Sequence, residues 1–116
     1  MKLLTAAIKA GLPSLYSQEH MRDPIVHCKF FTPWTYWTWF VTEGEERDDD
    51  FLFFGFVIGH EEELGYFCLS ELESIEGPCG LKIECDLYFE PGPLSEVVAR
   101  FKGEPVTPIQ NLTDES

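Results

Sequence analysis

Basic residues are scarce in this chain of 116 residues. Eight Lys and Arg stand against 21 Asp and Glu, which gives a formal net charge of −13 at pH 7. A surface that binds nucleic acid needs clustered Lys and Arg to neutralise phosphates. With so few cations we expect no direct binding of DNA or RNA, and no attraction to an acidic membrane surface.

Long apolar runs are also missing. Lys, Glu, Gly or Pro interrupts every hydrophobic stretch well before the roughly 18 residues that a membrane span requires. Near the amino end, Lys9 breaks the apolar run before the hydrophobic region of a signal peptide would be complete. We therefore expect a cytoplasmic protein without a membrane segment.

Catalytic and metal-binding motifs are absent from the sequence. It contains no G-x-S-x-G, no H-E-x-x-H and no C-x-x-C. Cysteines at Cys28, Cys68, Cys79 and Cys85 are more typical of free thiols that serve as small core residues. The Pro-Cys-Gly setting of Cys79 makes it the exposed one. We expect no enzyme, no cofactor and no metal site.

The chain does contain enough apolar material for a core. Its residues are 44% hydrophobic and 15% aromatic, in a length typical of one domain. Regular patterning ends at Glu104-Pro105. We expect a single domain over residues 1–104, followed by a flexible tail at 105–116.

Hydrophobic periodicity predicts an α+β domain, with a mainly antiparallel sheet of about five strands and two or three short helices packed against it. Helices are expected after the capping residue Thr5, after the capping-box residue Ser70, and at 94–102, where apolar side chains share one face before Gly103. Strands are expected at 25–32, 34–42, 51–58, 64–69 and 81–90.

Three of these segments carry sharper expectations. The strand at 51–58 is apolar on both faces, which predicts an interior strand with a bulge or close approach at Gly55. The segment at 43–50 has no apolar side chain, so we expect a solvated connection, and 59–63 is expected to form a second acidic turn. The alternation at 81–90 predicts one core face and one solvent face.

Negative charge is concentrated in the block from Glu43 to Glu96. This block holds sixteen of the acidic residues and two of the basic ones, for a formal charge of −14. On an extended strand, Glu84 and Asp86 would lie about 6.6 Å apart, the rise of two phosphates at about 3.4 Å each. Such carboxylates favour binding to the basic surface of a nucleic-acid-binding protein. The candidate residues are Glu43, Glu45, Glu46, Asp48, Asp49, Asp50, Glu61, Glu62, Glu63, Glu84, Asp86 and Glu90.

Other interpretations of the same residues stay open. The acidic residues are also typical of a solvated face that only maintains solubility. A magnesium or calcium site is a further alternative, although the spacing matches no known loop, and its ligands would be Asp48, Asp49, Asp50, His60 and Glu61 to Glu63. The aromatic run at 34–40 lacks the basic groove of a single-strand binder, which favours core packing or a protein interface.

Several phrases of the sequence resemble a family of small uncharacterised proteins carried on bacterial plasmids, integrated elements and phages. The phrases are WTWFVTEGE at 37–45, DDFLFFGF at 49–56, ELGYF at 63–67, LSELE at 69–73, DLYFEP at 86–91 and PLSEV at 93–97. The resemblance spans most of residues 1–98. It implies a mobile-element context and brings no established activity.

Charge and resemblance together lead to two functional hypotheses. The first is a non-enzymatic inhibitor that acts as a DNA mimic on the basic groove of a host defence complex, either a CRISPR effector or a restriction enzyme. The second is an accessory protein of mobile-element maintenance or transfer that binds a protein partner through its aromatic surface. In the second case the charge serves solubility alone.

Overall fold

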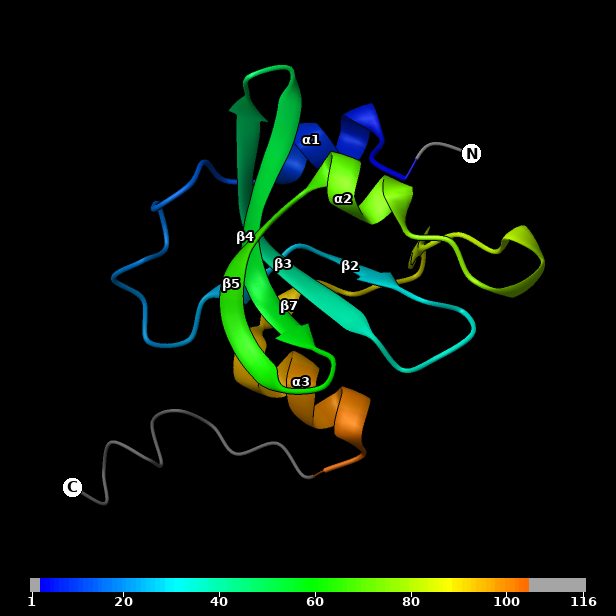
Figure 1. The fold of residues 1–116 in the computed structure, drawn as a ribbon. Helices are drawn as coiled ribbons and strands as arrows, with labels where there is room; N and C mark the ends of the chain where they lie inside the picture. The colour runs from blue at the N-terminus through cyan, green and yellow to red at the C-terminus, as the bar shows by residue number, and fades with distance from the viewer. Residues whose placement is uncertain (1–2, 105–116) are drawn as a thin grey trace.

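The computed structural model of the chain describes residues 3–104, so the expected tail at 105–116 lies outside the described residues. Its α+β architecture confirms the prediction (Figure 1). A five-stranded antiparallel sheet has the order β5-β4-β3-β2-β6, and a small two-stranded sheet joins β1 to β7. Within residues 3–104, no helix is long and apolar enough to cross a membrane.

The elements follow one another in the order helix, strands, helices, strands and helix. The strands are β1 (Ile25–Val26), β2 (Cys28–Phe31), β3 (Thr38–Arg47), β4 (Asp50–Ile58), β5 (Glu62–Cys68), β6 (Glu84–Cys85) and β7 (Gly92–Pro93). The helices are α1 (Ala6–Gly11), α2 (Leu69–Ser74), the 3-10 turn η1 (Pro78–Gly80) and α3 (Leu94–Lys102).

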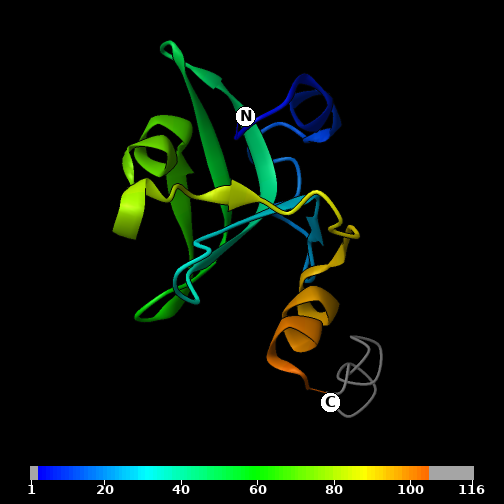
Figure 2. The same cartoon turned by 90° about the vertical axis from the view of Figure 1, so that its right-hand side faces the viewer.

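Two core clusters lie on opposite faces of β3, because successive side chains of a strand alternate. Trp39 and Val41 belong to the larger cluster, against which residues of α1 and α2 pack. Phe40 belongs to the smaller cluster, which includes Val97 of α3. The sheet is therefore covered on both faces near its centre, as the apolar pattern predicted (Figure 2).

Strand β4 is an interior strand between β3 and β5, which confirms the prediction for 51–58. Its register with β3 shifts between Val41 and Glu43, so Thr42 forms a β-bulge. Beside this bulge, a methyl group on Gly55 would collide with the main-chain oxygen of Phe40. The predicted close approach at Gly55 is confirmed.

The predicted solvated connection at 43–50 is wrong. Strand β3 continues through Glu43 to Arg47, and only Asp48 and Asp49 form the turn to β4. Both aspartates have positive φ angles, 48° and 65°, as a two-residue type I′ hairpin turn requires. Aspartate tolerates this backbone region better than most residues. The polar segment is therefore mostly strand, because its partners on β4 supply the apolar side chains.

The predicted strand at 81–90 is also wrong in most of its length. Only Glu84–Cys85 pairs with β2, and the chain then turns, since the N–H of Phe89 donates to the oxygen of Asp86 over 3.3 Å. Leu87 is 62% exposed where the alternation predicted core. The Asp86 carboxylate accepts the N–H of Tyr88 over 3.0 Å, which favours a turn over an extended strand.

The other predicted elements hold with shifted ends. The predicted strand at 25–32 is interrupted at His27, and its two halves, β1 and β2, belong to different sheets. Thr5 caps α1 as predicted, and Gly103 ends α3 with φ of 71°. Helix α2 begins earlier than predicted, with Cys68 as its N-cap, and the Glu71 carboxylate accepts the Cys68 N–H over 3.2 Å.

Candidate partner-binding surface

Glu43 is buried, with only 4% of its surface exposed. Its carboxylate accepts the main-chain N–H of Tyr16 over 2.8 Å and that of Gln18 over 2.6 Å. These contacts hold the irregular segment at 14–24 against β3. The prediction that Glu43 faces a partner is therefore wrong: the β-bulge at Thr42 lies directly before it, and its carboxylate binds the chain itself.

Glu45 has the same role two residues further along β3. One carboxylate oxygen accepts the N–H of Leu15 over 2.9 Å, and the other accepts the Nε–H of Arg47 over 3.2 Å. Between the two glutamates, the N–H of Gly44 donates to the oxygen of Pro13 over 3.0 Å. Three consecutive positions of β3 thus bind the segment that follows α1.

Asp50 joins the hairpin to the beginning of α2. Its carboxylate accepts both the hydroxyl of Ser70, over 2.5 Å, and the Ser70 N–H, over 3.1 Å, and it also accepts the N–H of Phe51. These hydrogen bonds, led by the Ser70 hydroxyl, lower the pKa of Asp50 from 3.8 to about 2. Asp50 therefore fixes the geometry of the hairpin tip against α2.

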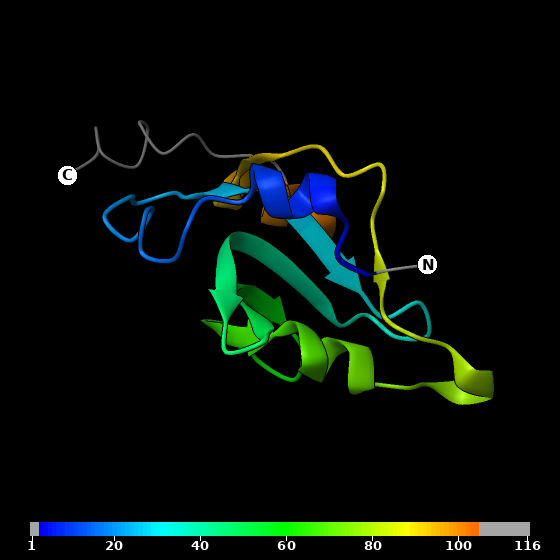
Figure 3. The same cartoon turned by 90° about the horizontal axis from the view of Figure 1, so that it is seen from above.

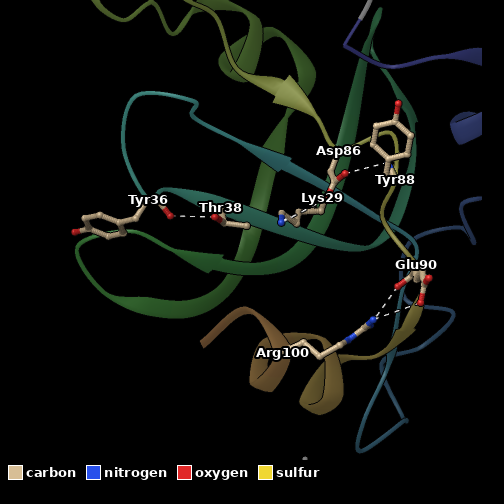
Figure 4. Close-up of polar contacts among 7 residues, drawn as sticks. All are labelled: Lys29, Tyr36, Thr38, Asp86, Tyr88, Glu90 and Arg100. Carbon is tan, nitrogen blue, oxygen red and sulfur yellow. Dashed lines mark hydrogen bonds and ion pairs between the residues drawn. The ribbon is translucent and has the colours of Figure 1, made fainter. Parts of the chain in front are cut away.

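Asp86 and Glu90 lie beside a hollow of about 340 Å³ between the 86–90 turn and α3 (Figure 4). Asp86 forms an ion pair with Lys29 at 3.5 Å, and both side chains are mostly buried. Glu90 pairs with Arg100 at 3.7 Å and remains 84% exposed. The sequence-based spacing of carboxylates along one strand is therefore wrong, because Asp86 and Glu90 lie in a turn outside β6.

The thiols are free, as predicted. Cys28 and Cys85 are buried, and Cys79 is exposed. Burial raises the pKa of Cys28 above its usual range, and the carboxylate of Glu71 beside Cys68 raises the pKa of that thiol. Each of these two groups is thus held as the neutral thiol, which makes it a poor nucleophile.

The largest concentration of exposed carboxylates lies at the tip of the β3–β4 hairpin. We call this region the acidic hollow, a depression of about 570 Å³. Helices α1 and α2 both lie beside the hairpin (Figure 3), and residues of both line the hollow. Its lining holds five carboxylates and two cations: Glu46, Asp48, Asp49, Asp50, Glu73, Lys9 and Arg47. Glu73 was not among the predicted residues. Its contribution depends on α2 folding back toward the hairpin, which no local pattern reveals.

Glu61, Glu62 and Glu63 lie at the other end of β4 from the acidic hollow. Glu62 and Glu63 belong to β5 and not to the predicted turn, and Glu62 forms an ion pair with Lys102 at 2.6 Å. Since β4 spans eight residue steps, the two acidic groups are about 26 Å apart. The alternative metal site, which needed both groups together, is therefore not assembled. Within residues 3–104, no group of three or more potential ligands is placed to hold a metal ion.

Six of the seven cations in residues 3–104 form ion pairs with carboxylates of the same chain. Residues 3–104 contain six ion pairs: Lys9–Glu46, Lys29–Asp86, Arg47–Glu45, Lys82–Glu76, Arg100–Glu90 and Lys102–Glu62. The remaining described cation, Arg22, also has an interaction partner. The surface therefore offers unneutralised carboxylates, led by Asp48 and Asp49 at the hairpin turn.

The aromatic run at 34–40 mostly packs within the fold. Trp39 and Phe40 are buried, while Tyr36 is 57% exposed. Trp34 packs against Gly77, and Trp37 against Gly59. Together with Trp39 these tryptophans line an apolar hollow of about 240 Å³. Core packing or a protein interface was predicted for these rings. Most of them pack in the core, and the hollow leaves part of them accessible.

The fold and surface define a small acidic α+β protein, whose sheet presents carboxylates at both ends of a long hairpin. A family model described as Protein of unknown function (DUF2958) matches residues 3–103, so the chain belongs to that family. No curated protein matches the chain, and no solved structure matches it either. Membership of an uncharacterised family is thereby confirmed, and no activity comes with it.

Proposed function

We propose that this protein is a non-enzymatic inhibitor that binds the basic nucleic-acid groove of a host defence complex, as a DNA mimic. The observation that carries the proposal is the unequal use of charge. Six of the seven Lys and Arg residues in the described part of the chain form ion pairs with its carboxylates, whereas the turn residues Asp48 and Asp49 carry unneutralised carboxylates at an exposed hairpin tip. The partner class is a CRISPR effector or a restriction enzyme, in the cytoplasm of a cell that carries a mobile element.

Electrostatics support this proposal. An excess of one sign speeds encounter with a surface of the opposite sign and repels nucleic acid itself. The acidic hollow has five carboxylates against two cations, and both cations already contact carboxylates. A partner that contributes Lys or Arg at this position would gain attraction without first breaking those pairs.

The distances also suit a groove that normally holds a phosphate backbone. The acidic hollow and the Glu61–Glu63 group lie about 26 Å apart along β4, the length of about eight phosphate steps on one strand. Each end of the hairpin would then take the place of a short stretch of backbone. The contact residues that remain in the proposal are Glu46, Asp48, Asp49, Glu61, Glu62, Glu63, Glu84 and Glu90.

The test uses the full chain with a fourfold change in the acidic hollow: Glu46→Gln, Asp48→Asn, Asp49→Asn and Glu73→Gln. The tagged protein is incubated with bacterial lysate, and bound proteins are eluted by a salt series and, in parallel, by duplex DNA. We expect a nucleic-acid-binding defence protein that moderate salt and DNA both release, and we expect the fourfold variant to capture at least tenfold less of it.

A matched variant keeps the total charge the same. Glu19→Gln, Glu76→Gln, Glu96→Gln and Glu104→Gln together remove four carboxylates that lie outside the acidic hollow and are not among the proposed contact residues. We expect this control to retain most of the capture. Equal loss in both variants would mean that overall charge, and not the hairpin tip, determines binding. Full capture by the acidic-hollow variant would disprove the decoy mechanism.

One observation favours the second candidate, an accessory protein that binds a partner through aromatic residues. The tryptophan-lined hollow contains no charged side chain, and Tyr36, which lies in sequence between its lining residues Thr35 and Trp37, is exposed. In that case Tyr36→Ser would abolish partner capture, the acidic-hollow variant would not, and capture would resist salt. The same pull-down therefore separates the two candidates.

A further inference from the structure

Strand β5 (Glu62–Cys68) forms one edge of the five-stranded sheet (Figure 1). It pairs with β4 over seven positions, and among residues 3–104 no strand pairs with its other side. An edge strand presents unpaired N–H and C=O groups that can bind a further strand. Native proteins usually shorten or interrupt such edges, so a regular edge of seven residues deserves a functional explanation.

The hydrogen-bonding pattern identifies which residues direct their main chain outward. In an antiparallel ladder each residue points both groups at the same neighbour, and successive residues alternate. The N–H of Gly59 donates to the oxygen of Glu61 over 3.0 Å, so these two residues form a hydrogen-bonded pair. Hydrogen-bonded pairs of the β4–β5 ladder therefore join odd-numbered residues. The same alternation continues along the ladder through Val57 with Glu63, Gly55 with Gly65, and Phe53 with Phe67.

The even-numbered residues of β5 therefore face away from β4. The N–H of Cys68 agrees with this phase, because it donates to the Glu71 carboxylate instead of to β4. By alternation, the N–H and C=O groups of Leu64 and Tyr66 point outward. These four groups are available to a strand that pairs with the edge.

Gly65 supports the approach of another backbone at the same place. A methyl group on Gly65 would meet nothing within 4 Å, so the monomer does not require a glycine there. Glycine weakens a strand interior and often marks a close approach of another chain. In an added antiparallel strand, the residue opposite Gly65 would form a non-hydrogen-bonded pair, whose Cα atoms approach to about 4.5 Å.

One side of this edge is apolar and hollowed. Leu64 and Tyr66 are each 53% exposed, and they lie beside a hollow of about 280 Å³. Tyr16 and Met21, 49% and 40% exposed, line the same hollow. An added strand would therefore find apolar contact for every second side chain, in addition to main-chain hydrogen bonds.

Charge distinguishes between the possible occupants. Exposed carboxylates flank β5 at both ends, with Glu61 and Glu63 near its start and Glu71 after its end. A second copy of a chain with net charge −13 would bring like charges together at these ends. Lysine or arginine opposite Glu63 would instead form an attractive cross-strand pair.

We propose that β5 binds an extended segment of a basic partner by strand addition, with apolar residues opposite Leu64 and Tyr66 and basic residues opposite Glu62 and Glu63. This inference deepens the proposed function, since it rests on a basic partner and names how one segment of it is held. Antiparallel pairing places the basic residues at the carboxyl end of the segment.

The probe is the acetylated and amidated peptide Thr-Val-Thr-Val-Lys-Lys, titrated to several millimolar into the ¹⁵N-labelled full chain. We expect saturable shifts of the Leu64, Gly65 and Tyr66 amide signals. A peptide of the same composition with its valines and threonines exchanged keeps the charge but puts threonine opposite Leu64 and Tyr66. We expect it to bind at least threefold more weakly.

Methylated probes test the hydrogen bonds without altering the protein. The two valine amides point at β5 in the proposed register, whereas the threonine amides point away. N-methylation of both valines removes two hydrogen bonds and is expected to weaken binding at least tenfold, while N-methylation of the threonines changes it less than threefold. Equal effects of the two methylations would overturn strand addition in this register.

Two variants locate the site on the protein. Tyr66→Pro removes an outward N–H and is expected to weaken binding of the peptide about tenfold. Tyr66→Thr is the control, because it also replaces the tyrosine side chain but keeps that N–H. Suppose that capture of the partner protein from lysate is lost in the fourfold acidic-hollow variant but unchanged in Tyr66→Pro. This result would overturn the strand inference and leave the proposed function standing. No shift at Leu64 and Tyr66 would overturn it as well. The edge would instead bind a second copy if the chain without peptide had the mass of a dimer in solution and Tyr66→Pro had the mass of a monomer.

Discussion

Gln18 donates its main-chain N–H to the Glu43 carboxylate over 2.6 Å, although 25 positions separate the two residues. Gln18 is also buried, and its side-chain amide donates to the oxygens of Thr42 and Ile25. The irregular segment between α1 and β1 is thereby fixed to β3 by specific polar contacts. A carboxylate in the most acidic part of the chain acts here as an internal ligand.

Loss of this internal ligand should destabilise the fold. Glu43→Gln keeps the shape but replaces one accepting oxygen by an amide NH2, so one of the two N–H donors loses its partner. We expect the free energy of unfolding to fall by about 1–3 kcal/mol, measured by urea denaturation. The exposed residue Glu63 provides the control: Glu63→Gln should change stability by less than about 0.5 kcal/mol. Similar effects at both positions would contradict this role of Glu43.

The two glycines of the β4–β5 ladder should respond in opposite ways to the same substitution. Gly55→Ala forces a methyl group against the Phe40 main chain, and we expect destabilisation of about 3 kcal/mol. Gly65→Ala places its methyl in open space and should stabilise the chain by about 0.5–1 kcal/mol. Thermal unfolding of the two variants checks both. A stable Gly55→Ala variant would mean that β3 and β4 separate more easily than the register indicates.

The positive φ of Asp49 predicts a preference for glycine at the hairpin turn. Asp49→Gly and Asp49→Ala remove the same charge, so their difference isolates the backbone effect. We expect the glycine variant to be more stable than the alanine variant by about 1 kcal/mol. Equal stabilities in chemical denaturation would show that the turn relaxes to another geometry.

Stability should depend on pH through Asp50. Its pKa is lowered in the folded chain, from 3.8 to about 2, by hydrogen bonds led by the Ser70 hydroxyl. The stabilisation is therefore present above pH 3.8 and is lost as the pH falls through about 2. We expect the stability difference between the native chain and Asp50→Asn to shrink over that range. Ser70→Ala should reduce the pH dependence, and an unchanged profile would contradict the contact.

Sequence patterns predicted the fold well where the hydrophobic periodicity and the residues that end an element indicate the same helix or strand. The helix at 94–102, the cap at Thr5 and the interior strand at 51–58 all follow from local periodicity. The strand predicted from the alternation at 81–90 forms only at Glu84–Cys85, because this edge of the sheet offers pairing with β2 alone. Beyond it, the Asp86 side chain stabilises a turn instead. Alternation alone does not reveal whether a neighbouring strand is present.

The candidate site was less predictable for a different reason. Composition predicts that carboxylates abound between Glu43 and Glu96, but it does not distinguish inward from outward ones. Glu43 and Glu46 look alike in sequence. Burial of the first depends on a bulge at Thr42 and on the segment around Gln18, both of which are tertiary features.

The internal contacts of Glu43 and Glu45 constrain the evolution of these two positions more than that of the acidic positions at the hairpin tip. A carboxylate that must reach main-chain donors on another segment depends on side-chain length, so aspartate, shorter by one methylene, is a poor replacement. At the hairpin tip, by contrast, Asp48 and Asp49 could exchange with asparagine or glycine while carboxylates arise at adjacent positions. Relatives should therefore retain glutamate at 43 and 45, while the charged positions of the tip drift.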